Sequence, residues 1–162
     1  MEIEFFKYQG TGNDFVLIDN RKELFPKTDT HCIKYLCDRR FGVGGDGLIL
    51  LENDDEFDFK MVYFNSDGAE STMCGNGGRC LVAFAKYLGI IEDETKFTAV
   101  DGLHSATIDE TGKVRLKMKD VDEVIKRESH LFLDTGSPHH VQVVKNIDAL
   151  NVQKEGSKIR YG

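Results

Sequence analysis

The stretch that decides the fold reads Met73-Cys74-Gly75-Asn76-Gly77-Gly78-Arg79-Cys80, and an apolar periodic segment follows it directly. In that segment the apolar side chains that recur on one helical face are Leu81, Phe84, Ala85 and Leu88. Gly89 then supplies a stop signal. The pattern predicts a glycine-rich turn that leads into a helix with one buried face.

Cys74 stands at the entry to this helix, where the first backbone N–H groups lack intrahelical partners and the helix dipole favours an anion. A thiolate is stabilised in such a place and can act as a base, while the thiol can act as an acid. The N–H groups of Gly75 and Asn76 could hold a substrate carboxylate, because glycine permits close approach. A thiol beside an amino-acid carboxylate indicates chemistry at the α-carbon. The alternative is a tight turn in which Cys74 is an inert cap.

Outward from this helix, short apolar runs alternate with turn residues. Their β-branched and aromatic content predicts strands over residues 3–9, 15–20, 47–52, 57–65, 97–100, 103–108, 114–118, 130–134 and 140–144. A second helix is predicted over residues 28–41, with Gly42 as its C-terminal signal. Strands are expected to dominate from there to the end of the chain, and residues 159–161 read as the middle of an element.

Composition bounds the class of protein. The 162 residues are 40% hydrophobic, which is enough to bury a core, and the net charge of -7 opposes binding to nucleic acid. No apolar run approaches the roughly 18 residues of a membrane helix, and the N-terminus lacks the positive region of a secretory signal. The four cysteines are too few for a disulfide framework. We therefore expect a cytoplasmic protein without membrane or nucleic-acid partners.

Other motifs favour neither a cofactor nor a metal. Residues 42–47 satisfy the glycine pattern of dinucleotide-binding proteins, but a predicted helix precedes them and a strand follows, which is the reverse of the required order. A nucleotide-binding protein is therefore the weakest alternative. The cysteine spacings do not fit a zinc site, and no lysine is singled out for a Schiff base. We interpret Cys32, Cys37 and Cys80 as small buried hydrophobic residues.

Four loops in the same order and spacing resemble those of diaminopimelate epimerases. They are Lys7-Tyr8-Gln9-Gly10-Thr11-Gly12-Asn13-Asp14-Phe15, Phe64-Asn65-Ser66-Asp67-Gly68, the stretch around Cys74 quoted above, and Thr135-Gly136-Ser137-Pro138-His139. The resemblance implies a cofactor-independent interconversion of LL- and meso-diaminopimelate, in which one thiolate removes the α-proton and a second thiol protonates the opposite face. Its small-molecule partner would be this amino acid.

The resemblance also implies roles for single residues. Cys74 matches the family's first catalytic cysteine, and His139 matches a histidine that tunes the thiol pair. The family's substrate contacts fall on Asn13, Asn65, Gly75 and Asn76. Ser137 stands where the family usually has a substrate-contacting asparagine, and Gly47 where some members carry glutamine. The plainer alternatives are turn capping for Asn13 and Asn65 and an exposed loop position for His139.

The implied fold is α/β (α+β), with two pseudo-symmetric domains that each wrap a curved, mostly antiparallel sheet on a central helix. Residues 1–122 would form most of the first domain, and residues 123–162 the opening of the second. The family's second cysteine motif has no match in this sequence, so we expect a fragment that is inactive alone and exposes apolar surface, with a homodimer as one outcome.

Two other functions remain open from the sequence. A proline-racemase-like amino-acid racemase would share the fold and a similar cysteine motif, although Asn76 and the Gly12-Asn13-Asp14 start favour the diaminopimelate branch. A non-catalytic module that keeps only the carboxylate-binding turn belongs to a different class.

Overall fold

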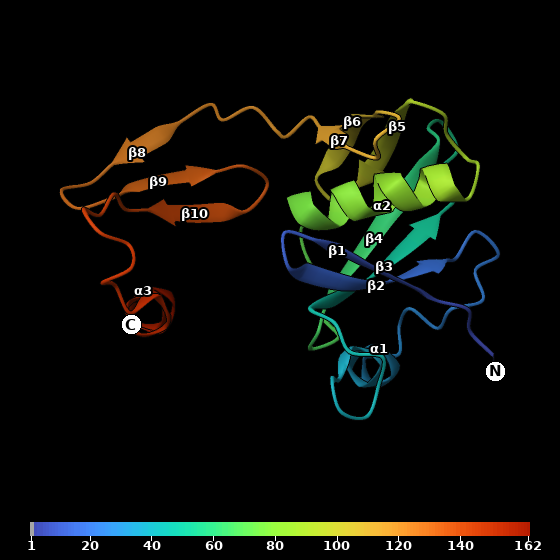
Figure 1. The fold of residues 1–162 in the computed structure, drawn as a ribbon, viewed down its shortest axis with the longest axis horizontal. Helices are drawn as coiled ribbons and strands as arrows, with labels where there is room; N and C mark the ends of the chain where they lie inside the picture. Colours follow the sequence, from blue (N-terminus) through green and yellow to red (C-terminus); the bar gives the residue numbers. More distant parts are fainter. Residues whose placement is uncertain (1) are drawn as a thin grey trace. The chain divides into compact units, whose positions relative to one another are not determined.

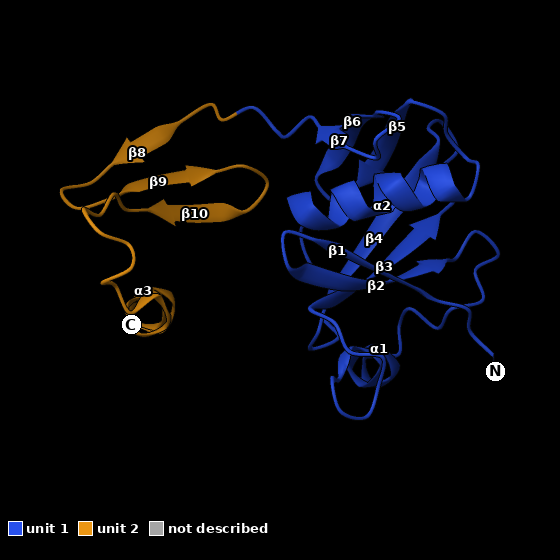
Figure 2. Cartoon of the chain, viewed as in Figure 1, with its two compact units in different colours: residues 1–120 blue, residues 121–162 orange. Residues whose placement is uncertain are grey.

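The computed structural model describes residues 2–162, which fall into two compact units, one ending at Asp120 and the other running from Val121 to Gly162 (Figure 2). Each unit has its own sheet. We describe them separately.

The first unit is built on a sheet of seven strands that lie in chain order. They are β1 (Phe6–Gly10), β2 (Asn13–Asp19), β3 (Gly47–Glu52), β4 (Phe59–Asn65), β5 (Glu94–Ala99), β6 (Gly102–Ile108) and β7 (Val114–Leu116). Neighbouring strands are antiparallel except for the parallel pairs β2/β3 and β4/β5. The mostly antiparallel sheet predicted from the sequence is therefore confirmed, and the predicted strand over residues 47–52 coincides with β3.

Helix α2 (Gly75–Tyr87) covers one face of this sheet (Figure 1). Its apolar stripe packs on side chains that alternate along the central strands, among them Phe15, Leu17, Ile49 and Leu51. Two glycines in its first turn allow the close approach. A Cβ atom at Gly77 would lie 2.8 Å from Ile49 Cδ1, and one at Gly78 would lie 2.6 Å from Met73 Cε. The predicted helix after Cys74 is confirmed.

Helix α1 (Thr30–Cys37) lies on the opposite face, where it covers the remaining side chains of β2, β3 and β4 (Figure 1). Both faces of the central strands are thus buried, which explains why β3 is apolar at nearly every position. The prediction of a helix as far as residue 41 is wrong. The helix ends at Asp38, because this residue is extended and its carboxylate accepts hydrogen bonds from the N–H groups of Arg40 and Phe41.

The second unit contains a three-stranded antiparallel sheet of β8 (Val124–Lys126), β9 (Leu131–Asp134) and β10 (Pro138–Val141), followed by helix α3 (Val152–Tyr161). The prediction that strands dominate to the end of the chain is wrong. Asn151 caps α3 through a hydrogen bond from the N–H of Lys154, and Lys158 pairs with Glu155. No side chain within residues 121–162 is buried in this unit.

Four charged side chains tie the β1–β2 hairpin to the loop before β3. Asp14 accepts hydrogen bonds from Lys7 Nζ at 2.7 Å and from Arg39 Nη2 at 2.6 Å, and Arg39 Nη2 also donates to Asp46 at 2.8 Å. The backbone N–H of Asp46 donates to the carbonyl of Asp14 at 2.8 Å. Hydrogen bonds from Arg39, and then from Lys7, hold the pKa of the Asp14 carboxyl well below its usual range. We call these four residues the hairpin ion-pair cluster.

A side chain at position 47 should be costly. A Cβ atom on Gly47 would lie 2.5 Å from the carbonyl oxygen of Phe64, which cannot move without breaking the β3/β4 ladder. We expect Gly47→Ala to lower the free energy of unfolding by about 1–3 kcal/mol, measured by urea titration. Gly10→Ala is the matched control, because its Cβ would make only ordinary contacts at 3.4 Å or more, and equal losses in the two variants would contradict the steric explanation.

The cluster should also give stability a defined pH dependence. Because the folded-state pKa of Asp14 is lowered, its contribution is fully present above the unfolded value near 3.9 and is lost as pH falls further. We therefore expect Arg39→Gln to be less stable than the unmodified chain at pH 6, with the gap narrowing between pH 4 and pH 2. Lys34→Gln, which removes a similar exposed charge from α1, is the control. A gap that stays constant with pH would contradict the assignment.

Candidate active site

Cys74 occupies the N-cap position of α2, with an extended backbone (φ -109°, ψ 119°). Its half-buried Sγ accepts a hydrogen bond from the N–H of Gly77 at 3.5 Å, and its carbonyl accepts one from the N–H of Gly78 at 2.7 Å. The N–H groups of the first helical residues, Gly75 and Asn76, have no acceptor in a preceding turn of helix. The sulfur thus lies where the sequence placed it, beside backbone donors suited to an anion.

Asn13 lies beside this thiol although it comes from the first residue of β2. Its Oδ1 is 3.8 Å from Cys74 Sγ and 3.3 Å from Asn76 Nδ2. Asn13 therefore contacts two other predicted site residues, Cys74 and Asn76. Because amides donate and accept, this group can bind both a carboxylate and an ammonium.

Asn65 reaches the same edge of the sheet as the last residue of β4. Register places it opposite Gly47, which in turn lies next to Phe15 on β2, two residues after Asn13. Its backbone carbonyl accepts from the N–H of Gly68 at 2.9 Å, which closes the following turn. The starts of β2 and β3 and the end of β4 therefore bring Asn13 and Asn65 to one edge.

Ser137 and His139 lie in the second unit, at the β9–β10 turn. His139 Nδ1 is 2.6 Å from the carbonyl oxygen of Ser137. Since a carbonyl only accepts, Nδ1 is the donor in this contact and carries a proton. The two residues are in contact with each other, and their proposed roles at the thiol stay predictions.

Sequence reasoning missed two residues beside the site. The ring of Tyr63 occupies the space next to Gly47, since a Cβ there would lie 2.6 Å from Tyr63 Cε2. Burial, with Coulombic contributions from Cys74 and Asp46, raises the pKa of Tyr63 to about 12, so the phenol stays protonated at neutral pH. Its position two residues before Asn65, on the same face of a strand, was the available signal. The second residue is Asp46, which accepts a hydrogen bond from Asn13 Nδ2 at 2.7 Å.

The other cysteines are poorly suited to proton transfer. Burial raises the pKa of both Cys37 and Cys80 to about 11, in agreement with their interpretation as small buried hydrophobic residues. Cys32 differs from that interpretation because it is only half-buried on α1, although burial still raises the pKa of its thiol. All four cysteines are free.

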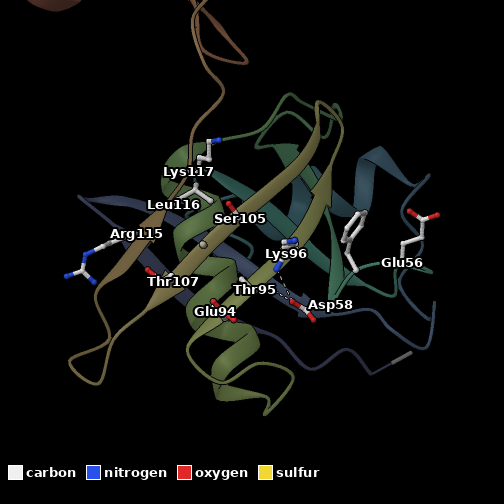
Figure 3. Close-up of a pocket in the computed structure, with 12 residues that line it drawn as sticks. Glu56, Asp58, Glu94, Thr95, Lys96, Ser105, Thr107, Arg115, Leu116 and Lys117 are labelled. Carbon is white, nitrogen blue, oxygen red and sulfur yellow. Dashed lines mark hydrogen bonds between the residues drawn. The ribbon is translucent and has the colours of Figure 1, made fainter.

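A cavity of about 770 Å³ lies on the strands β5, β6 and β7 (Figure 3). Its lining is charged, with Asp58 accepting hydrogen bonds from Thr95 Oγ1 at 2.7 Å and from the N–H of Lys96 at 2.9 Å. None of the predicted site residues lines it. The volume of this cavity is therefore not evidence that the chemistry takes place there.

Among residues 2–162, no group of three or more His, Cys, Asp or Glu side chains gathers as metal ligands would.

Solved structures share the fold at low sequence identity. A Bacillus anthracis phenazine biosynthesis protein of the PhzF family superposes with a TM-score of 0.71 at 17% identity, covering 91% of this chain and 58% of that one. A hydroxyproline epimerase from Agrobacterium vitis superposes with a TM-score of 0.55 at 15% identity, covering 81% and 48%. These likenesses support the epimerase-like fold and carry no assignment of substrate.

Sequence relatives are far more similar. The chain is 62% identical over 159 residues to a diaminopimelate epimerase of Flavobacterium psychrophilum, covering 98% of this chain and 62% of that protein. It is 44% identical over 160 residues to one from Chlorobaculum tepidum, covering 94% and 62%. The chain thus spans about 62% of the length of these relatives. The sequence model of the diaminopimelate epimerase family matches residues 5–124. With the cysteine at the helix start and the two asparagines beside it, these matches show that the chain belongs to the diaminopimelate epimerase family.

Proposed function

We propose that this chain supplies one of the two proton-transfer thiols of an enzyme that interconverts LL- and meso-2,6-diaminopimelate without a cofactor. The observation that carries the proposal is the half-buried sulfur of Cys74 at the start of α2, with the amides of Asn13 and Asn76 beside it. Relatives that carry the name of this activity and match nearly the whole chain support it.

The chemistry follows from the geometry of the helix start. A substrate carboxylate bound to the N–H groups of Gly75 and Asn76 would be stabilised by the helix dipole, including when charge builds up on it as the α-proton leaves. The Cys74 thiolate takes that proton and becomes a thiol, leaving a carbanion delocalised into the carboxylate. A second thiol then delivers a proton to the opposite face. In the reverse direction the Cys74 thiol is the acid.

One thiol cannot invert a centre by this route, because it returns the proton to the face from which it came. We expect the 162-residue chain alone not to convert LL-diaminopimelate. The test is a chimera in which this chain is joined to the part of the F. psychrophilum relative that it does not cover. Chiral chromatography and deuterium uptake from heavy water measure the reaction.

The chimera should be active, and Cys74→Ala in it should reduce turnover by at least about 100-fold, the usual range for losing a general acid-base group. Cys32→Ala is the matched control, because that thiol lies on α1 at the other face of the sheet. Full activity of the Cys74→Ala chimera, or turnover by the isolated 162-residue chain, would contradict the proposal.

The second unit has its own place in the proposal. We assign residues 1–122 to the first epimerase domain and residues 123–162 to the beginning of the second, and the division of the chain after Asp120 supports this boundary. Ser137 would then contact the distal end of the substrate through its hydroxyl, and His139 would favour the thiolate of one cysteine.

We also propose that the isolated chain self-associates, with a homodimer as the simplest form. The second unit leaves apolar side chains in solvent, with Val143 90%, Ile147 59% and Val152 58% exposed. Size-exclusion chromatography should show a species larger than 18.3 kDa, and Val143→Asn combined with Ile147→Asn should shift it towards the monomer. A clean monomer peak for the unmodified chain would contradict this expectation.

The expected compartment is the cytoplasm. Four free cysteines, one of them the proposed base, need reducing conditions to remain thiols. No helix in the described part of the chain combines the length and apolar character needed to cross a bilayer.

A further inference from the structure

The carboxylate of Asp46 accepts hydrogen bonds from two segments, the start of β2 and the loop after α1. Its Oδ2 accepts from Asn13 Nδ2 at 2.7 Å and from the N–H of Asp14 at 3.2 Å, and its Oδ1 accepts from Arg39 Nη2 at 2.8 Å. Arg39 is in turn held by Asp14, which is also paired with Lys7. These hydrogen bonds orient the carboxylate so that its Oδ2 faces Asn13 and its Oδ1 faces Arg39.

This acceptor decides which way the Asn13 amide points. The hydrogen bond from Asn13, followed by that from the Asp14 N–H and the one from Arg39, lowers the pKa of Asp46, so at neutral pH the carboxylate has no proton to donate. The Asn13 atom that faces it must then be the NH₂ group. The Asn13 oxygen consequently faces the other way, towards Cys74 Sγ at 3.8 Å and the NH₂ group of Asn76 at 3.3 Å.

We propose that Asp46, which is held by Arg39, is a positioning residue for Cys74. It turns the Asn13 amide so that the carbonyl oxygen accepts a hydrogen bond from the Cys74 thiol. The proposal rests on the proposed function, in which Cys74 moves a proton. A carbonyl oxygen beside the sulfur accepts a hydrogen bond from the S–H group and aims it, whereas the reversed amide would direct an N–H at the sulfur, where it can donate a hydrogen bond to sulfur.

The hairpin ion-pair cluster is suited to this role because its charges balance. Lys7 and Arg39 carry two positive charges and Asp14 and Asp46 two negative ones. Asp46 can thus orient an amide without adding a net charge beside the sulfur. Two further titratable groups that interact with Cys74 are the phenol of Tyr63 and the buried thiol of Cys80, and both stay protonated near neutral pH because burial raises their pKa values.

The test is a double-mutant cycle on the reactivity of the thiol. Iodoacetamide reacts with the thiolate, and mass spectrometry of peptides follows Cys74 separately from the other three cysteines. At pH 7 in the 162-residue chain, Asp46→Ala should speed alkylation of Cys74 by about 2- to 10-fold, the factor that one hydrogen bond supplies, because the released amide can turn its NH₂ group to the sulfur. The same substitution in an Asn13→Ala background should change the rate by less than about 1.5-fold.

The double-mutant cycle separates the effect of the Asn13 amide orientation from the effect of the Asp46 charge on the Cys74 thiol. Loss of the Asp46 carboxylate also removes a negative charge near the thiolate, and that effect persists without Asn13. An equal acceleration in both backgrounds, or none in either, would overturn the proposal. Asp93→Ala is the charge-matched control, because it removes a carboxylate that is 79% exposed and paired with Lys86. It should leave the alkylation rate of Cys74 unchanged.

A second variant keeps the test decisive if Asp46→Ala does not fold, as judged by circular dichroism. In Asp46→Asn the carbonyl should stay with Arg39, and the new NH₂ group should face Asn13 and reverse its amide. The same acceleration at Cys74 is expected, and an unchanged rate in a folded protein would overturn the proposal. Alkylation needs no turnover, so an inactive chimera would count against the proposed function without deciding the role of Asp46.

Discussion

The close approach of the first turn of α2 to the sheet is the contact on which the rest of the first unit depends. Gly77 and Gly78 have no side chains, so the turn comes within contact of Ile49 and Met73. A helix start needs polar partners for its N–H groups, and this one lies at the sheet edge where β2 begins. The packing of this turn on the sheet thus buries apolar side chains of the core and leaves the N–H groups of the helix start available to an anion.

Local sequence predicted the elements whose signals lie within a few residues. The apolar run of β3 and the periodic segment of α2 are of this kind, and so is Cys74 at the helix start. The end of α1 was missed because the Asp38 side chain competes with the helix for backbone N–H groups. Helix α3 was missed because Gly156 interrupts a short and mostly polar segment.

The site residues also divide into those with a local sequence signal and those without one. Asn13, Asn65, Gly75 and Asn76 lie at the ends of elements beside glycine-marked turns, and the resemblance to a family suggested them. Tyr63 and Asp46 had no such signal, since the place of Tyr63 depends on the register of β3 with β4 and that of Asp46 on a hydrogen bond from Asn13, 33 residues away. Such contacts have no local signal. The fold itself is shared with proteins below 20% identity, so chemistry must be argued from the side chains.

The parallel pairing of β2 with β3 has a consequence for how the site comes into being. Parallel neighbours need a long crossover, and here residues 20–46 must first be folded back before the starts of both strands can meet. Helix α2, which Cys74 caps, comes later still in the chain. Contacts between segments far apart in sequence form slowly. In a growing or partly unfolded chain Cys74 therefore lacks these neighbours, and it meets Asn13 only when the start of β2 and the start of α2 have come together.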